Sequence, residues 1–181
     1  LNSKGLDITD ASQLTSVYQA QDPSKWRWIG GPIIQGKKTT KGAKEVVSPI
    51  DARVIGKVHV ATKADLEVAL SSASKAHGAW SQKPAVERAD CLDKLASLLE
   101  ENRDELMALC TFEAGKSISD AIAEVREAVD FCRYYANEAR TKLAADIMLP
   151  GPTGEENKLR LRGRGPFLCV SPWNFPLAIF M

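Results

Sequence analysis

Phe167-Leu168-Cys169-Val170-Ser171-Pro172-Trp173-Asn174-Phe175-Pro176 is the stretch that decides the fold class of this chain. Four apolar residues followed by Ser-Pro predict a short strand buried on both faces, as in a parallel sheet. Ligand sites of such sheets lie at the carboxyl ends of the strands. The amide of Asn174 can donate to an oxygen that gains negative charge, and flanking prolines restrict its backbone. From composition alone, a purely structural turn stays open, since prolines mark turns.

The overall composition is that of a chain that folds around an apolar core. Hydrophobic residues make up 44% of 181 positions, a length that suits one domain or a piece of a larger one. The net charge of +1 excludes nucleic acid or an anionic membrane as a partner bound through overall charge. The sequence contains neither an apolar run of about 18 residues nor a signal-like start, so we expect a cytoplasmic location.

The cysteines do not form a metal or redox motif. Cys91, Cys110, Cys132 and Cys169 are too far apart for CxxC spacing, and the chain has only two histidines. We therefore expect no metal and four free thiols. All four thiols are expected to be packed, the first three on helical faces and Cys169 inside a strand, because unreactive cysteines are usually buried.

The first third of the chain changes character near residue 30. Residues 1–30 are mixed and polar and predict a linker from an upstream domain, with Trp26 and Trp28 docking on the fold. Residues 31–181 then form one domain. Short β-branched runs separated by glycine and proline between Gly30 and Ala61 predict a small antiparallel meander.

The middle of the chain has helical periodicity, with apolar residues three and four positions apart. Thr62 with Asp65 resembles a capping box, Pro84 suits a first helical turn, and Ser117 suits an N-cap. Gly115 is a natural C-terminal stop. Four helices are predicted, and they run from Thr62 to near Gly78, from Pro84 to near Asn102, through Leu106 to Gly115, and from Ser117 to about Ala139.

Beyond the helices, alternation of charged and apolar residues from Lys158 to Arg164 predicts a strand. Its cations fit an edge strand protected by charge better than a phosphate contact. The chain then stops at an apolar segment, Leu177 to Met181, where natural termini are usually polar. We therefore expect a domain truncated at its C-terminus.

The hexapeptide Ser171 to Pro176 resembles the proline, tryptophan, asparagine, phenylalanine, proline motif of the aldehyde dehydrogenase superfamily. Further resemblances follow in the right order, at Trp80, Glu87-Arg88, Glu113-Ala114-Gly115-Lys116 and Glu124-Val125. The resemblance implies an α/β fold, the N-terminal part of the aldehyde dehydrogenase fold. A small β meander, about four helices and the first strand of an incomplete Rossmann-like sheet would make up that part.

A narrower resemblance is to the aldehyde dehydrogenase half of bacterial proline utilization A proteins. It is carried by Ala123 to Phe131, Arg133 to Ala136, Ser171 to Phe180 and the leader Asn2 to Asp7. It implies oxidation of L-glutamate γ-semialdehyde, formed from 1-pyrroline-5-carboxylate, to L-glutamate with NAD, and an upstream FAD-dependent proline dehydrogenase. It also implies a homo-oligomer. A stand-alone aldehyde dehydrogenase of broader range and a non-enzymatic helical interaction module remain alternatives.

The family resemblance also implies roles for particular residues. Asn174 matches the asparagine that stabilises the oxyanion, and Phe175 and Ile179 match positions that line the aldehyde tunnel. The positions matching the cofactor contact at the strand end are Val170, Ser171, Pro172 and Trp173. The cysteine nucleophile and the glutamate base of the family have no counterpart in this sequence, so we expect residues 1–181 alone to be inactive.

Two other groups invite chemistry but have simpler interpretations. Glu113 and Lys116 flank a predicted helix stop, which favours a cap or a surface ion pair over general acid and base catalysis. His77 lies near a predicted helix end and is interpreted as a C-terminal cap rather than a catalytic base.

Overall fold

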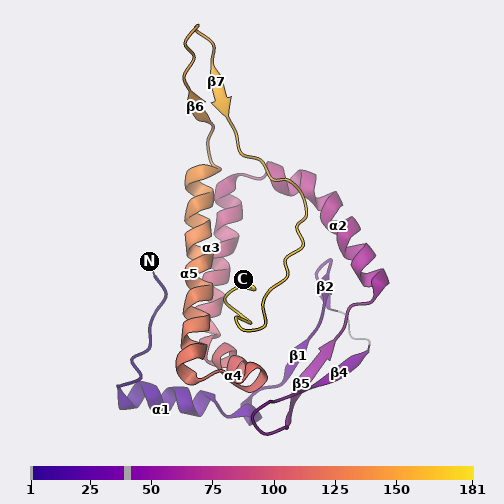
Figure 1. The fold of residues 1–181 in the computed structure, drawn as a ribbon, viewed down its shortest axis with the longest axis vertical. Coiled ribbons are helices and arrows are strands. Elements are labelled where there is room, and N and C mark those ends of the chain that lie inside the picture. Colours follow the sequence, from indigo (N-terminus) through magenta and orange to yellow (C-terminus); the bar gives the residue numbers. More distant parts are fainter. Residues whose placement is uncertain (1, 39–41) are drawn as a thin grey trace.

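The computed structural model describes residues 2–38 and 42–181. Its centre is a column of two antiparallel helices, α3 (Ala85–Glu101) and α5 (Ile118–Lys142), with α4 (Arg103–Ala114) at the lower end (Figure 1). Helix α2 (Lys63–Gln82) runs obliquely downward from the top of the column at the right of Figure 1, and the sheets formed by residues 28–59 lie below it. The C-terminal chain descends between α2 and the column.

The core of the described chain lies between α3, α4 and α5. Alanines at 89, 96, 128 and 136 are fully buried, and these small side chains let α3 and α5 approach closely. Met107 of α4 is 1% exposed and fills the lower end of the same core. The apolar faces predicted for the second, third and fourth helices are therefore largely confirmed as the core, although Val86 and Tyr135 are exposed. The apolar face predicted for the first helix is wrong, because α2 buries no residue among those described.

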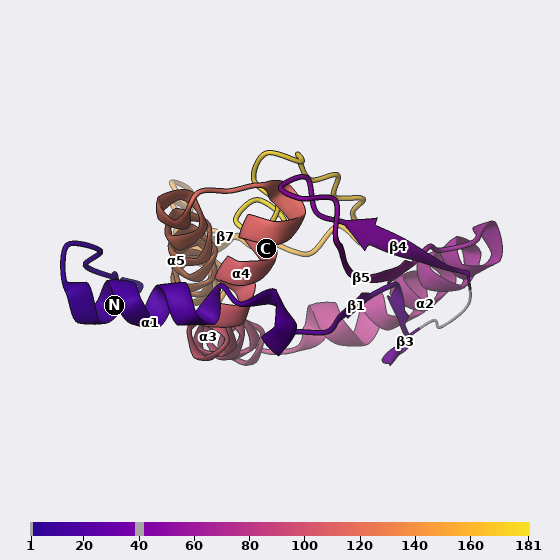
Figure 2. The same cartoon turned by 90° about the horizontal axis from the view of Figure 1, so that it is seen from below.

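Helix α1 (Ala11–Ala20) lies within the segment for which the sequence predicts a linker. Asp10 caps it by accepting from the backbone N–H groups of Ser12 and Gln13. Val17 is 2% exposed and belongs to the central core, so α1 packs across the lower end of the column (Figure 2). A short 3-10 turn, Pro23–Lys25, follows. The upstream domain that a linker would serve stays a prediction.

The small sheets only partly follow the predicted antiparallel meander. Strands β4 (Ala43–Val47) and β5 (Val54–His59) pair antiparallel, as do β2 (Ile33–Ile34) and β3 (Lys37–Lys38). The prediction is wrong for the first strand, because β1 (Trp28–Gly30) pairs parallel with β5, in the order β1-β5-β4. β-Branched runs show where strands lie but do not specify which neighbour each takes.

The helix ends largely follow the predicted signals. Thr62 and Asp65 form a complete capping box, and Gly115 ends α4 in the left-handed conformation with φ 68°. The predicted stop near Gly78 is wrong, because α2 continues to Gln82. One glycine costs a helix only about 1 kcal/mol, whereas Pro84 forces the preceding Lys83 into an extended conformation and ends the helix.

The C-terminal quarter departs most from the predicted strands. Strands β6 (Ile147–Leu149) and β7 (Asn157–Leu159) form a projecting hairpin, so the strand predicted for 158–164 ends at Leu159 (Figure 1). The buried strand predicted for 167–170 is not formed, and Leu168 and Val170 are 87% and 84% exposed. A strand buried on both faces needs neighbouring strands, and the described residues supply none there.

Candidate active site

The chain from Ser171 to Met181 folds into a series of turns against α4 and the start of α5 (Figures 1 and 2). Ala178 is 1% exposed and anchors these turns in the core, while Leu177 and Met181 pack against the central cluster. The hexapeptide is therefore fixed on its C-terminal side by apolar packing. The residues before it, from 160 to 170, have no regular secondary structure.

Polar contacts hold the same turns from α5 and from the loop before it. Lys116 donates from Nζ to the backbone oxygen of Asn174 at 2.6 Å and pairs with Glu124 Oε1 at 3.0 Å. Glu124 Oε2 accepts from the backbone N–H groups of Leu177 at 3.1 Å and Ala178 at 2.9 Å. Glu124 is 2% exposed, so this is a buried carboxylate satisfied by backbone donors and one cation.

The Asn174 side chain is free to act on a ligand. It is exposed, and within residues 2–38 and 42–181 its amide makes no hydrogen bond, although its backbone oxygen is held by Lys116. A neutral amide on a fixed backbone is a suitable donor to a developing oxyanion. The geometry is thus compatible with the role that the resemblance implies for Asn174.

The other candidate residues are brought together only in part. Phe175 is 41% exposed, and Lys116 Nζ lies 5.2 Å from its ring centre. Trp173 lines a 440 Å³ cavity against α4, together with Glu113 and other residues. Ile179 is 46% exposed, and Ser171 and Pro172 join no cavity described for this chain. Val170 stands apart on the exposed run.

Two of the four cysteines are buried and therefore poorly suited to act as nucleophiles. Burial raises the pKa of the Cys110 thiol to about 11, and the negative charge of Glu124 adds to the shift. Burial also raises the pKa of Cys132. All four thiols are free, and the packing predicted for these two is confirmed. Packing is wrong for Cys91, on the outer face of α3, and for Cys169, whose strand does not form.

Lys116 and Glu124 are where the sequence interpretation of the site falls short. The ion pair predicted around Glu113 and Lys116 instead joins Lys116 to Glu124, and it is not a surface pair. The available signal was the position of Glu124 on the apolar stripe of its helix, between Ala121 and Ala128, both fully buried. A carboxylate at such a position needs a partner.

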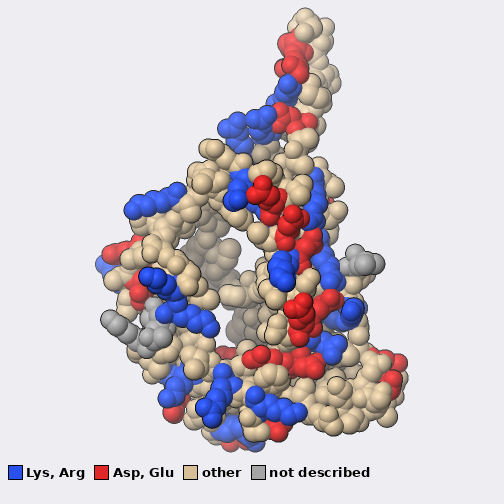
Figure 3. Space-filling model, turned by 180° about the vertical axis from the view of Figure 1, so that it is seen from behind, with Lys and Arg blue, Asp and Glu red and all other residues tan. Residues whose placement is uncertain are grey.

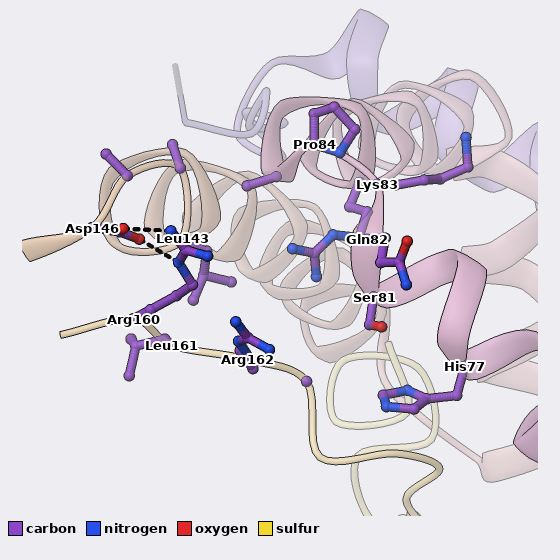
Figure 4. Close-up of a pocket in the computed structure, with 15 residues that line it drawn as sticks. His77, Ser81, Gln82, Lys83, Pro84, Leu143, Asp146, Arg160, Leu161 and Arg162 are labelled. Carbon is purple, nitrogen blue, oxygen red and sulfur yellow. Dashed lines mark hydrogen bonds and ion pairs between the residues drawn. The ribbon is translucent and has the colours of Figure 1, made fainter. Parts of the chain in front are cut away.

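A second cavity, of 790 Å³, is lined by the end of α2 and the start of α3 on one side (Figure 4). Residues 143–146, which follow α5, and residues 160–163 line its other side. His77 lines it from the body of α2, so the predicted C-terminal cap is wrong because the helix runs on past it. Arg160 forms two hydrogen bonds with Asp146, as the dashed lines in Figure 4 show. The charge of Arg160 is therefore neutralised by Asp146, but the edge-strand interpretation is wrong for residues 160–164, because the strand ends at Leu159.

Charges of both signs are mixed on the face of the molecule shown in Figure 3. Figure 3 shows Lys and Arg interspersed with Asp and Glu along the column of α3 and α5. In the described ranges, no group of three His, Cys, Asp or Glu residues is arranged to hold a metal ion. No described helix is long and apolar enough to cross a membrane.

Comparison with known proteins assigns the chain to a family. Residues 36–181 match the Aldehyde dehydrogenase family. The chain belongs to the aldehyde dehydrogenase family. The α/β class and the N-terminal part of this fold, as expected from the hexapeptide, are confirmed by solved aldehyde dehydrogenases. The 1-pyrroline-5-carboxylate dehydrogenase from Thermus with bound NAD superimposes with a TM-score of 0.89 at 31% identity, covering 99% of this chain and 36% of that chain.

The aldehyde dehydrogenases most similar in sequence include two kinds of protein. Bifunctional protein PutA of Escherichia coli (strain K12) is 36% identical over 181 residues, 99% of this chain and 13% of PutA. The 1-pyrroline-5-carboxylate dehydrogenase of Staphylococcus haemolyticus is 34% identical over 149 residues, 81% of this chain and 29% of that enzyme. The chain therefore spans only a small share of the length of these relatives.

Proposed function

We propose that this chain is part of an NAD-dependent aldehyde dehydrogenase that oxidises L-glutamate γ-semialdehyde to L-glutamate in proline catabolism. The carrying observation is Asn174, whose backbone oxygen is held by Lys116 from the loop before α5 while its amide is left free in the described chain. Similarity to PutA and to 1-pyrroline-5-carboxylate dehydrogenases supports the choice of substrate.

In the proposed reaction, Asn174 donates a hydrogen bond to the aldehyde oxygen as it becomes an oxyanion. The oxyanion arises when a cysteine thiolate attacks the aldehyde carbon, and a glutamate-activated water later releases the acid. We propose that both groups come from outside residues 1–181, because the resemblance places no counterpart of either in this sequence. Burial of Cys110 and Cys132, which raises the pKa of both thiols, supports this for those two cysteines. Residues 1–181 alone should therefore form no acid product.

The segment before Asn174 offers contacts for the cofactor. Val170 and Trp173 are 84% and 88% exposed, Pro172 is exposed, and the backbone between them is in no strand, so most of this segment has free surface for a ligand. Val170, Ser171, Pro172 and Trp173 would hold NAD, which accepts the hydride when bound. The NAD-bound relative supports this choice of cofactor.

Phe175 and Ile179 supply the apolar contacts of the proposed substrate site. Both side chains are 41–46% exposed, so they have free apolar surface for the aliphatic chain of the semialdehyde. The groups that neutralise the amino acid head of the substrate would come from elsewhere in the enzyme. Specificity for a short, charged aldehyde would then depend both on Phe175 and Ile179 and on the groups elsewhere in the enzyme that bind the amino acid head.

The wider context is also part of the proposal. It includes fusion to an upstream FAD-dependent proline dehydrogenase, a homo-oligomeric assembly and a cytoplasmic location, and the similarity to a protein named bifunctional supports the fusion. A stand-alone dehydrogenase is the second candidate, since 1-pyrroline-5-carboxylate dehydrogenases are about as similar, at 34% identity. The broader-range aldehyde dehydrogenase would share Asn174 and Phe175.

The deciding experiment uses the active enzyme that contains this chain. NADH formation should be faster with glutamate semialdehyde than with simple aliphatic aldehydes of similar length. The same preparation, given proline, should reduce its flavin if the two enzymes are fused. Preference for aliphatic aldehydes would contradict the substrate, and absence of proline-dependent flavin reduction would favour the stand-alone enzyme.

A further inference from the structure

We propose that Lys116 and Glu124 are positioning residues that set the place of the Asn174 amide, acting through the backbone of the hexapeptide. This inference rests on the proposed function, because it assumes that Asn174 contacts the oxyanion. It gives a role to the Glu-Ala-Gly-Lys motif that is distinct from acid and base catalysis. We call the set Lys116, Glu124 and the backbone of 174–178 the latch.

The latch grips the chain on both sides of Phe175. On one side, the Lys116 ammonium lies 2.6 Å from the carbonyl oxygen of Asn174. On the other side, Glu124 takes the consecutive N–H groups of Leu177 and Ala178 at 3.1 and 2.9 Å. Lys116 Nζ lies 3.0 Å from Glu124 Oε1, so an ion pair joins the two residues that hold the chain on either side of Phe175.

The environment makes the latch sensitive to the loss of either charge. Glu124 is 2% exposed, and the Lys116 side chain is 19% exposed. Within the described residues, Glu124 Oε1 accepts no hydrogen bond, so the ammonium of Lys116 alone balances that oxygen. Removing Lys116 leaves a buried carboxylate oxygen without a partner, which favours rearrangement of the turns that Glu124 holds.

Local structure explains why the latch lies where it does. Gly115, with φ 68°, turns the chain sharply after α4, which brings Lys116 back over the start of α5. Ser117 then begins α5, so Glu124 lies about two turns along the helix on its buried face. The chain around Asn174 is thus held by elements that the helical core has already fixed.

Positioning is the relevant consequence because the Asn174 side chain forms no hydrogen bond with the described residues. Its amide is fixed only through its backbone, and the backbone oxygen is the atom that Lys116 holds. Catalytic donors must be held to within about 0.5 Å, and a shift of about 1 Å can cost a hundredfold in rate. Small movements of these turns should therefore affect turnover more than binding.

The test is a double-mutant cycle in the active enzyme that contains this chain. Lys116→Met should lower kcat about tenfold to hundredfold while the KM for NAD stays within about twofold. Lys116→Arg should retain most of the activity, since it keeps the charge. In an Asn174→Ala background, Lys116→Met should cause little further loss of kcat, because the effects of substituting residues that act through one group are not additive.

The matched control is Lys142→Met, which removes a surface lysine paired with Glu138 and should leave kcat unchanged.

The outcomes separate the latch from the proposed function. Unchanged turnover in Lys116→Met, or losses that multiply in the double variant, would overturn the latch. If Lys116→Met does not fold, the same cycle with Glu124→Gln, which keeps an acceptor for the two N–H groups, decides in its place. If Asn174→Ala itself keeps full turnover, the role of Asn174 fails first, and the latch fails with it.

Discussion

The helical column of 85–142 and the C-terminal run of 160–181 differ in how they are held. Each helix of the column buries an apolar face against another, and alanines at the α3–α5 contact are fully buried. In the C-terminal run, Phe167, Leu168, Val170 and Trp173 are each at least 73% exposed, and Ala178 is the one buried residue among 160–181. The helices of the column pack against one another, whereas the C-terminal run contacts the rest of the described chain at only a few residues.

The difference shows where the proposed chemistry depends on other parts of the enzyme. The column provides the latch that holds Asn174, so the proposed oxyanion donor is fixed by packed helices of the described chain. The proposed cofactor contacts at 170–173 have no such support within the described residues. We therefore expect substitutions in the latch and in the column to alter the structure of this chain directly. The effect of substitutions at 170–173 should instead depend on which residues of the rest of the enzyme contact this segment.

The largest effect is expected at Asn174, where the two regions meet. Asn174→Ala in the active enzyme should lower kcat about a hundredfold or more, the scale for losing one oxyanion donor, with a smaller effect on NAD binding. Steady-state NADH formation measures this. Asn137→Ala, an exposed asparagine on α5, is the matched control and should be near neutral. Full turnover without the Asn174 amide would remove it from the mechanism.

The assignment of the core to the helical column can be tested by removing a buried side chain from it. Met107→Ala removes a side chain that is 1% exposed, so unfolding should become easier by about 2–5 kcal/mol through lost burial and a new cavity. Met148→Ala removes the same side chain from the hairpin, where it is 56% exposed, and should change stability by less than about 0.5 kcal/mol. Equal effects in denaturant titrations would contradict the assignment of the core.

A pair of glycines tests the unforeseen parallel pairing of β1 with β5. A Cβ on Gly56 would lie 2.4 Å from the backbone oxygen of Trp28, so Gly56→Ala should destabilise the sheet by about 1–3 kcal/mol. Gly78→Ala meets open space inside α2 and should instead stabilise by about 1 kcal/mol. Opposite signs in thermal unfolding are expected, and a neutral Gly56→Ala would argue against the close approach of β1.

Local signals were enough to predict α2 to α5, apart from the end of α2, because the signals and their partners are close in sequence, whereas α1 was missed. The capping box at Thr62, the stop at Gly115 and the cap at Ser117 each act within a few residues. The pairing of β1 and the absence of a strand at 167–170 depend on distant or external neighbours. No pattern within a run of β-branched or apolar residues contains that information.

The candidate site shows the same division. Asn174 and Phe175 were identified from one contiguous motif, and the structure places them side by side over Lys116. The contacts of Lys116 with the Asn174 backbone and of Glu124 with the Leu177 backbone were not predicted, since each joins residues more than fifty positions apart. A carboxylate on an apolar helical stripe indicates that a partner exists but does not name it.

The smallest effect is expected where the leader joins the column, at Glu100. Arg133 forms two hydrogen bonds with this carboxylate, at 3.2 and 2.8 Å, and lowers its pKa, and the backbone N–H of Lys4 donates to it as well. A carboxyl whose pKa is lowered by folding stabilises the fold above its unfolded pKa of about 4.3. That stabilisation is lost as the pH falls through the lower, folded pKa.

Glu100→Gln should therefore cost about 0.2–1 kcal/mol at pH 7, the range for partly exposed pairs. The difference from wild type should narrow below about pH 4.3, as the wild-type carboxylate also loses its charge. Denaturant titrations of both variants from pH 7 to pH 3 measure it. In an Arg133→Met background the cost of Glu100→Gln should shrink at pH 7 as well, because the guanidinium that favours the charged carboxylate is gone. A cost that stays constant with pH would mean that Glu100 acts through shape alone, and that charge does not hold the leader to the column.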